Sequence, residues 1–112
     1  MGRKMKIPAS FKIMGQKITV VVDPACFTEK DGVYGYASYR TNQIQLRPST
    51  ETHPINQEQL EQTFYHELIH FILYHAGSAY SGKHDYMHQD EGFVDLCGSL
   101  LHQANSTMEY GE

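Results

Sequence analysis

The run His66-Glu67-Leu68-Ile69-His70 is the most informative stretch of the chain, because it sets two histidines four positions apart in a segment with a helical hydrophobic pattern. Side chains at positions i and i+4 lie on the same face of a helix, so both imidazoles can reach one metal ion. The glutamate between them can accept a proton from water bound to that metal. The run therefore predicts a zinc site with Glu67 as general base.

A second acidic segment, from Glu91 to Asp95, supplies candidates for a third metal ligand. Catalytic zinc sites keep three protein ligands and leave a fourth position for water. Glu91 and Asp95 are again four positions apart, so one carboxylate can bind the metal while the other accepts the free N–H of a ligand histidine. An acidic first turn is also favoured by the helix dipole alone. His84 and His88 are alternative third ligands, because imidazole suits zinc equally well.

The HExxH run followed about twenty residues later by E-x-x-x-D resembles the gluzincin metallopeptidases, a clan of zinc enzymes. At this length the chain is most similar to minimal members, such as the minigluzincins and the short ImmA/IrrE-type or SprT-like domains. The resemblance covers roughly residues 33–104. It implies one zinc ion (Zn2+) per chain and a division of roles among five residues. The implied ligands are His66, His70 and Glu91, with Glu67 as general base and Asp95 as the hydrogen-bond partner of His66.

The resemblance also implies hydrolysis of a peptide bond, so the expected partner is a peptide or protein substrate. Peptides can be held extended along an exposed strand edge by main-chain hydrogen bonds. The candidate edge is the strand-like segment that contains Gly35, Tyr36, Ala37 and Ser38. A His or Tyr that donates a hydrogen bond to the oxyanion is expected in the connection between the two predicted helices, residues 78–89. The candidates there are Tyr80, His84, Tyr86 and His88.

An alternative function belongs to another class: a regulatory metal-binding module that keeps the fold and acts through a partner protein. Glu67 favours hydrolysis, because a structural zinc site would close its fourth position with another ligand. His53 and His102 have no partner in these patterns, and we expect them to be solvent-exposed or partly packed.

Composition limits the remaining possibilities. The 112 residues suit a single domain, 1–112, with flexible ends at 1–6 and 105–112, and the hydrophobic content of 40% is that of a folded globule. A net charge of −4 without a broad basic face argues against nucleic-acid binding, and the lack of an 18-residue apolar run argues against a membrane span. Cys26 and Cys97 lack CxxC spacing, which favours a reducing, cytoplasmic compartment.

The hydrophobic pattern predicts an α+β fold, with a small antiparallel sheet of about four strands followed by two main helices. Apolar alternation marks strands over 10–14 and 17–22, joined by a type II′ turn at Gly15-Gln16, and a second hairpin over 33–40 and 43–47. Asn56 and Gln59 predict the start of the first helix, which is expected to end before Gly77. Asp90 is the predicted cap of the second helix. The predicted buried stripe of the first helix comprises Leu60, Phe64, Leu68, Phe71 and Ile72.

Overall fold

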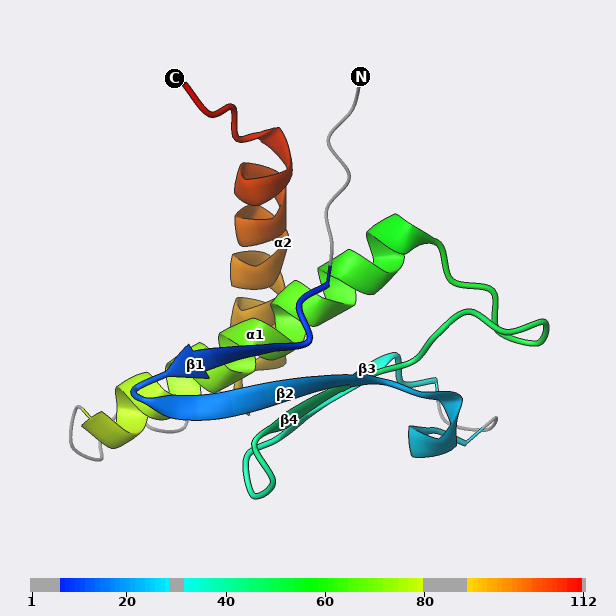
Figure 1. Ribbon diagram of the computed structural model, residues 1–112, viewed down its shortest axis with the longest axis horizontal. Helices are drawn as coiled ribbons and strands as arrows, with labels where there is room; N and C mark the ends of the chain where they lie inside the picture. Colours follow the sequence, from blue (N-terminus) through cyan, green and yellow to red (C-terminus); the bar gives the residue numbers. More distant parts are fainter. Residues whose placement is uncertain (1–6, 29–31, 80–88, 112) are drawn as a thin grey trace.

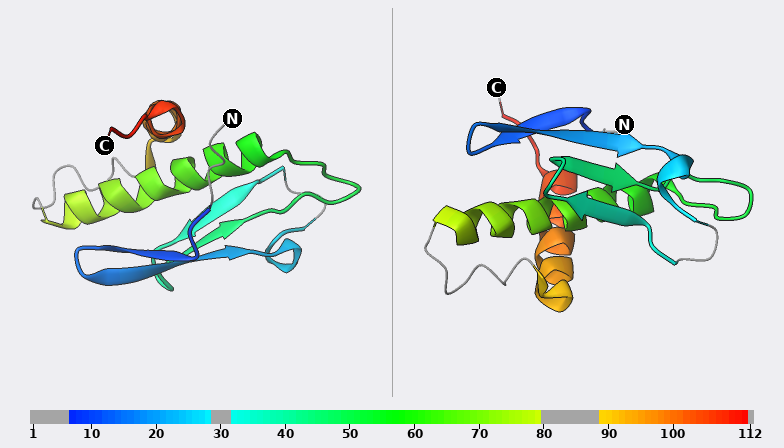
Figure 2. Two further views of the ribbon diagram at one scale, coloured as in Figure 1. Left: turned by 45° about the horizontal axis from the view of Figure 1, so that its top comes forward. Right: turned by 90° about the horizontal axis from the view of Figure 1, so that it is seen from below.

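The computed structural model describes residues 7–28, 32–79 and 89–111, and within them four strands precede two long helices (Figure 1). The elements are β1 (Ser10–Ile13), β2 (Gln16–Val22), the short 3-10 helix η1 (Pro24–Cys26), β3 (Gly35–Ser38), β4 (Gln43–Leu46), α1 (Gln57–Ala79) and α2 (Glu91–Thr107). The predicted α+β class is confirmed. Figure 2 shows three layers, with α1 between the sheet and α2.

The sheet is mixed, so the predicted antiparallel sheet is wrong in one of its pairings. The strand order is β1-β2-β4-β3; both hairpins are antiparallel, whereas β2 and β4 pair in parallel. Apolar alternation specifies a strand and its buried face but not its neighbour in another hairpin. The chain after β2 carries β3 to the far edge of the sheet, and β4 returns between them. The order therefore leaves β3 at the edge beside α1.

The first hairpin turns one residue earlier than predicted. Ile13 pairs with Gln16, so the loop consists of Met14 and Gly15, whose φ angles are 53° and 76°. Positive φ at both central residues defines a type I′ turn, which matches the right-handed twist of the strands. The second loop is also longer than predicted, because Ser38 pairs with Gln43 across residues 39–42.

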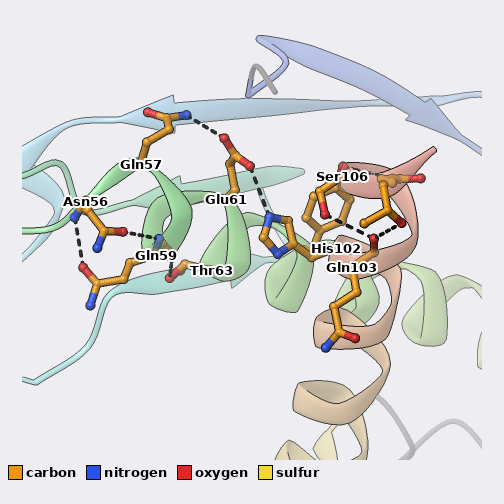
Figure 3. A network of polar contacts seen from close by, with 11 residues as sticks. Asn56, Gln57, Gln59, Glu61, Thr63, His102, Gln103 and Ser106 are labelled. Atoms are coloured by element: carbon orange, nitrogen blue, oxygen red, sulfur yellow. Dashed lines mark hydrogen bonds and ion pairs between the residues drawn. The ribbon is translucent and has the colours of Figure 1, made fainter. Parts of the chain in front are cut away.

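Helix α1 begins at the predicted capping box (Figure 3). The Gln59 amide N–H donates to Asn56 Oδ1 at 2.8 Å, and the Asn56 N–H donates to Gln59 Oε1 at 2.9 Å. These two bonds satisfy amide groups that a helix start otherwise leaves unpaired. The helix does not end before Gly77 as predicted but continues to Ala79, since a glycine costs a helix interior only about 1 kcal/mol.

Helix α1 is buried on two faces, which the prediction of a single stripe missed. Phe64 and Phe71 join Ile18, Ile44 and Leu46 of the sheet in the core. Tyr65 and Ile69 are also buried, whereas Ile72, predicted to be buried, is 39% exposed. A helix covered by a sheet on one side and another helix on the other needs a wider apolar surface than one stripe.

Helix α2 begins as predicted, because Asp90 Oδ1 accepts the Phe93 amide N–H at 3.1 Å. It continues to Thr107, so residues 105–107 of the predicted flexible end are helical. Asn105 Nδ2 donates to the Tyr65 hydroxyl at 2.9 Å, which ties this last turn to α1. No helix in the described part of the chain is long and apolar enough to cross a membrane.

Candidate metal centre and active site

The two histidines of the HExxH run lie one turn apart on α1 and face the start of α2. Their ring centroids are 5.0 Å apart. Both rings are largely covered, with side-chain exposures of 22% for His66 and 11% for His70. Helical spacing alone accounts for their common direction.

Glu91, the first residue of α2, meets both of these histidines. Its Oε1 atom lies 2.7 Å from His70 Nε2 and 3.3 Å from His66 Nε2. The Asp90 cap sets where α2 starts, and the first turn of the helix carries the Glu91 carboxylate across α1. The sequence left several residues open as a third ligand, and Glu91 is the one that the described structure brings to the two rings.

Asp95 contacts the other ring nitrogen of His66. Its Oδ1 atom lies 3.3 Å from His66 Nδ1, one helical turn after Glu91. A carboxylate on Nδ1 fixes the tautomer and orientation of an imidazole whose Nε2 is presented to a metal. The predicted spacing of Glu91 and Asp95 thus corresponds to contacts with opposite nitrogens of one ring.

The three side chains His66, His70 and Glu91 fit a zinc ion. Each offers one donor atom, and these atoms all lie within 4.8 Å of one another. Zinc bonds to nitrogen and oxygen are about 2.0–2.1 Å long, which puts donors in a tetrahedral site about 3.3–3.5 Å apart. The two imidazoles and one carboxylate are also a donor set that zinc enzymes use.

Glu67 is buried beside this cluster and turned toward the sheet. It is only 6% exposed, and burial raises the pKa of its carboxyl from the ordinary 4.5 to about 7. The nearby Glu91 charge raises the pKa further, while His66 lowers it. A carboxylate with a pKa near neutrality can both accept and return a proton at physiological pH.

The site opens into a cleft of about 420 Å³ between α1, the start of β3 and the start of α2. His66, Glu67, Glu91 and Asp95 line one side of this cleft. On the other side Gly35 packs tightly over α1: a Cβ atom there would lie 3.2 Å from Glu67 Oε2 and 2.6 Å from Thr63 Cγ2. Only glycine lets β3 approach Glu67 this closely.

Among the predicted substrate-binding residues, Gly35 lines the cleft. The Tyr36 ring instead stacks on Phe27 with centroids 5.3 Å apart. Ala37 packs against the core, and Ser38 shares a hydrogen bond with Thr41 at 2.6 Å. Any role of this strand in holding substrate therefore rests on its backbone.

Tyr39 is a neighbour of the site that the sequence analysis did not single out. Burial, and then the negative charges of Glu67 and Glu91, raise the pKa of its hydroxyl above the usual value, so it stays protonated. Its ring stacks on Tyr74 with centroids 4.3 Å apart. The signal available in the sequence was its place near the end of the predicted strand over 33–40. The predicted oxyanion donors Tyr80, His84, Tyr86 and His88 lie outside the described residues.

The strands, the HExxH helix and the acidic turn of α2 together define a minimal α+β domain of zincin-like type. The chain matches the SprT-like family over residues 10–108 and belongs to that family. This range contains every described strand and helix. The family has a zincin-like fold and is associated with zinc. No curated protein and no solved structure matches the chain.

The donor set predicts graded effects on zinc affinity. His66→Ala and His70→Ala should abolish tight binding, whereas Glu67→Gln should keep it, because the Glu67 carboxyl is turned toward Gly35 and is not among the three grouped donors. Asp95→Asn should weaken binding about 10–100-fold, as changes to the partners of ligand histidines do. Competition with a chromophoric chelator measures these affinities, with Glu58→Gln at an exposed site on α1 as control. Loss of zinc from Glu67→Gln as complete as that from His70→Ala would contradict the assignment.

The raised pKa of Glu67 predicts a pH-dependent stability for the zinc-free protein. The folded state holds this proton more tightly than the unfolded chain, so the resulting stabilisation is complete below about pH 4.5 and is lost as pH rises through about 7. Its size is on the order of 3 kcal/mol. Denaturant unfolding in chelator at pH 5 and pH 8 should show Glu67→Gln gaining stability relative to wild type at the higher pH. Parallel pH profiles for the two proteins would refute the shift.

Proposed function

We propose that this protein is a zinc-dependent metallopeptidase of gluzincin type. The observation that carries the proposal is the meeting of Glu91 with both HExxH histidines, 2.7 Å and 3.3 Å away, beside the buried carboxyl of Glu67. A cleft of about 420 Å³ opens onto His66, Glu67 and Glu91. Membership of the SprT-like family supports the same reaction class.

The proposed division of roles follows from the contacts. His66, His70 and Glu91 hold zinc, and Asp95 accepts the Nδ1–H of His66 and so keeps Nε2 directed at the metal. When bound, zinc supplies Lewis acidity, which acidifies water and polarises a carbonyl group. The three ligand side chains, from α1 and α2, would place the zinc site beside Glu67.

Glu67 handles the proton. In this proposal its carboxylate accepts a proton from the attacking water and then delivers it to the leaving amine. Burial under Gly35 excludes competing water from one side of the carboxyl and limits its possible directions. A more exposed glutamate would have an ordinary pKa and would accept a proton less readily.

The outer edge of β3, the last strand of the sheet, is the proposed substrate-binding edge. The Arg47 N–H donates to the Tyr34 carbonyl at 2.9 Å, so residues 34 and 47 form a hydrogen-bonded pair. Pairs alternate in an antiparallel ladder, so the backbone groups of Gly35 and Ala37 point away from β4. An extended peptide could pair with these groups and lie along the cleft that Gly35 lines.

We also propose a reducing, cytoplasmic location for the protein. Cys26 and Cys97 are both free thiols and half-buried in the structure. Small proteins of oxidising compartments commonly use their cysteines in disulfides.

Zinc-loaded protein should cleave unstructured peptides near neutral pH, and a peptide library screened by mass spectrometry tests this. Chelator should abolish cleavage, and added zinc should restore it. Glu67→Gln is the matched control, because it should keep the metal and lose activity. Indistinguishable cleavage by wild type and Glu67→Gln, together with a partner protein that binds both equally, would favour the regulatory alternative.

A proline substitution at each edge of the sheet tests, in the same cleavage assay, whether the outer edge of β3 binds the substrate. Ala37→Pro removes an outward N–H of β3 and should reduce cleavage more than zinc binding. Lys12→Pro is the control: the Val20 N–H donates to Ala9 O at 2.9 Å, so by alternation the Lys12 N–H points outward from β1, at the opposite edge. Equal losses of cleavage in the two variants would overturn a specific role for β3.

A further inference from the structure

One face of α2 makes the polar contacts with α1 that the structure describes, and they come from Glu91, Asp95, His102 and Asn105. Glu91, Asp95, Gly98 and His102 are spaced i, i+4, i+7 and i+11, which places them on one side of a helix. The first two contact the histidines of α1, as described above. The last two lie farther along α2 and contact none of the side chains of the candidate metal centre, and the mechanism assigns them no role.

Gly98 is the point at which the two helices touch through their backbones. A Cβ atom at this position would lie 3.0 Å from both Cα and N of His66 and 3.1 Å from the carbonyl carbon of Tyr65. Ordinary contacts between carbon atoms are about 3.5–4.0 Å. The obstructing atoms are helix backbone, which cannot turn aside as a side chain can. Any side chain at position 98 therefore forces α2 away from His66.

His102 forms a buried pair with Glu61 on the other side of this crossing (Figure 3). Its Nε2 atom lies 3.1 Å from Glu61 Oε1, and the two residues are only 5% and 7% exposed. Gln57 Nε2 donates to the second carboxylate oxygen of Glu61 at 3.1 Å, so the group is held on both sides. The expectation that His102 is exposed or partly packed without a partner is thus wrong.

The Glu61–His102 pair constrains the orientation of α2 more than it stabilises the fold. Burying an acid and a base together often gains little over apolar packing, because both groups lose their hydration. Its geometry is directional, however, since the 3.1 Å contact between His102 Nε2 and Glu61 Oε1 constrains where α2 crosses α1. The close approach at Gly98 and the pair at His102 define a point and a direction for α2, and the Asn105–Tyr65 hydrogen bond adds a further tie near the end of the helix. Figures 1 and 2 show α2 crossing α1 rather than lying alongside it.

We propose that Gly98 and the Glu61–His102 pair form a positioning device that sets Glu91 at the metal site; this inference rests on the proposed function. At a rise of about 1.5 Å per residue, His102 is about 6 Å from Gly98 along α2 and Glu91 is about 10 Å away in the other direction. A 1 Å shift at His102 about this pivot moves Glu91 by about 1.7 Å. Metal–ligand distances tolerate only about 0.2 Å. A small displacement of α2 at the Glu61–His102 pair therefore becomes a larger displacement of Glu91, the proposed third ligand.

The first test compares two identical substitutions in α2. Gly98→Ala should weaken zinc binding about tenfold or more. Losses of this size are typical when a residue that orients a metal ligand is changed. Gly92→Ala is the control, because a Cβ there would meet nothing nearer than 3.7 Å. On helix propensity alone both alanines would favour α2. The cobalt-substituted protein adds a spectroscopic readout, since a displaced carboxylate should alter the visible ligand-field bands in Gly98→Ala and leave them unchanged in Gly92→Ala.

The second test addresses the buried pair and remains informative if Gly98→Ala does not fold. Glu61→Gln should weaken zinc binding, and the exchange Glu61→His with His102→Glu should restore most of it, because the pair is rebuilt with its partners reversed. Residual dipolar couplings of the zinc-free proteins should show α2 reoriented relative to α1 in Glu61→Gln and returned in the exchange variant.

The outcomes separate the two proposals. The positioning device would be overturned if either Gly98→Ala or Glu61→Gln kept both the wild-type orientation of α2 and the wild-type zinc affinity. Absence of zinc binding by the wild type would overturn the proposed function instead, and the dipolar couplings of the zinc-free proteins would still decide whether the two contacts set the direction of α2.

Discussion

The close crossing of α2 over α1 at His66 is the constraint on which the candidate site depends. The HExxH run supplies two histidines and a glutamate from one helix, and the third donor has to come from another. The crossing brings the donor atoms of His66, His70 and Glu91 within 4.8 Å of one another. It requires a glycine at position 98, because the backbones of the two helices are in contact there. The sheet on the far side of α1 then completes the cleft.

The packing of the sheet against α1 sets the chemistry of Glu67. The edge strand β3 covers its carboxyl, and Gly35 allows that cover to be close. Burial raises the pKa of Glu67 to about 7, which costs stability when the group is ionised and suits it to proton transfer. Strained or costly features of this kind are typical of functional sites, where local stability is given up for reactivity.

The features that sequence predicted best are those encoded within one turn of helix. The HExxH spacing, the Asn56 capping box and the Asp90 cap depend on neighbours three or four positions away, and the structure has all three. The direction of β4 relative to β2, the burial of His102 and the need for Gly98 depend on which distant segments meet. No local pattern contains that information, although a glycine inside an apolar helical repeat was a usable signal for a close contact.

The measurement that tests the central claim most directly is zinc X-ray absorption on the metal-loaded protein. The account predicts only nitrogen and oxygen neighbours at about 2.0–2.1 Å, with the multiple-scattering signature of two imidazoles. Three imidazoles around the metal, or a sulfur neighbour at about 2.3 Å, would contradict the assignment of Glu91 as third ligand.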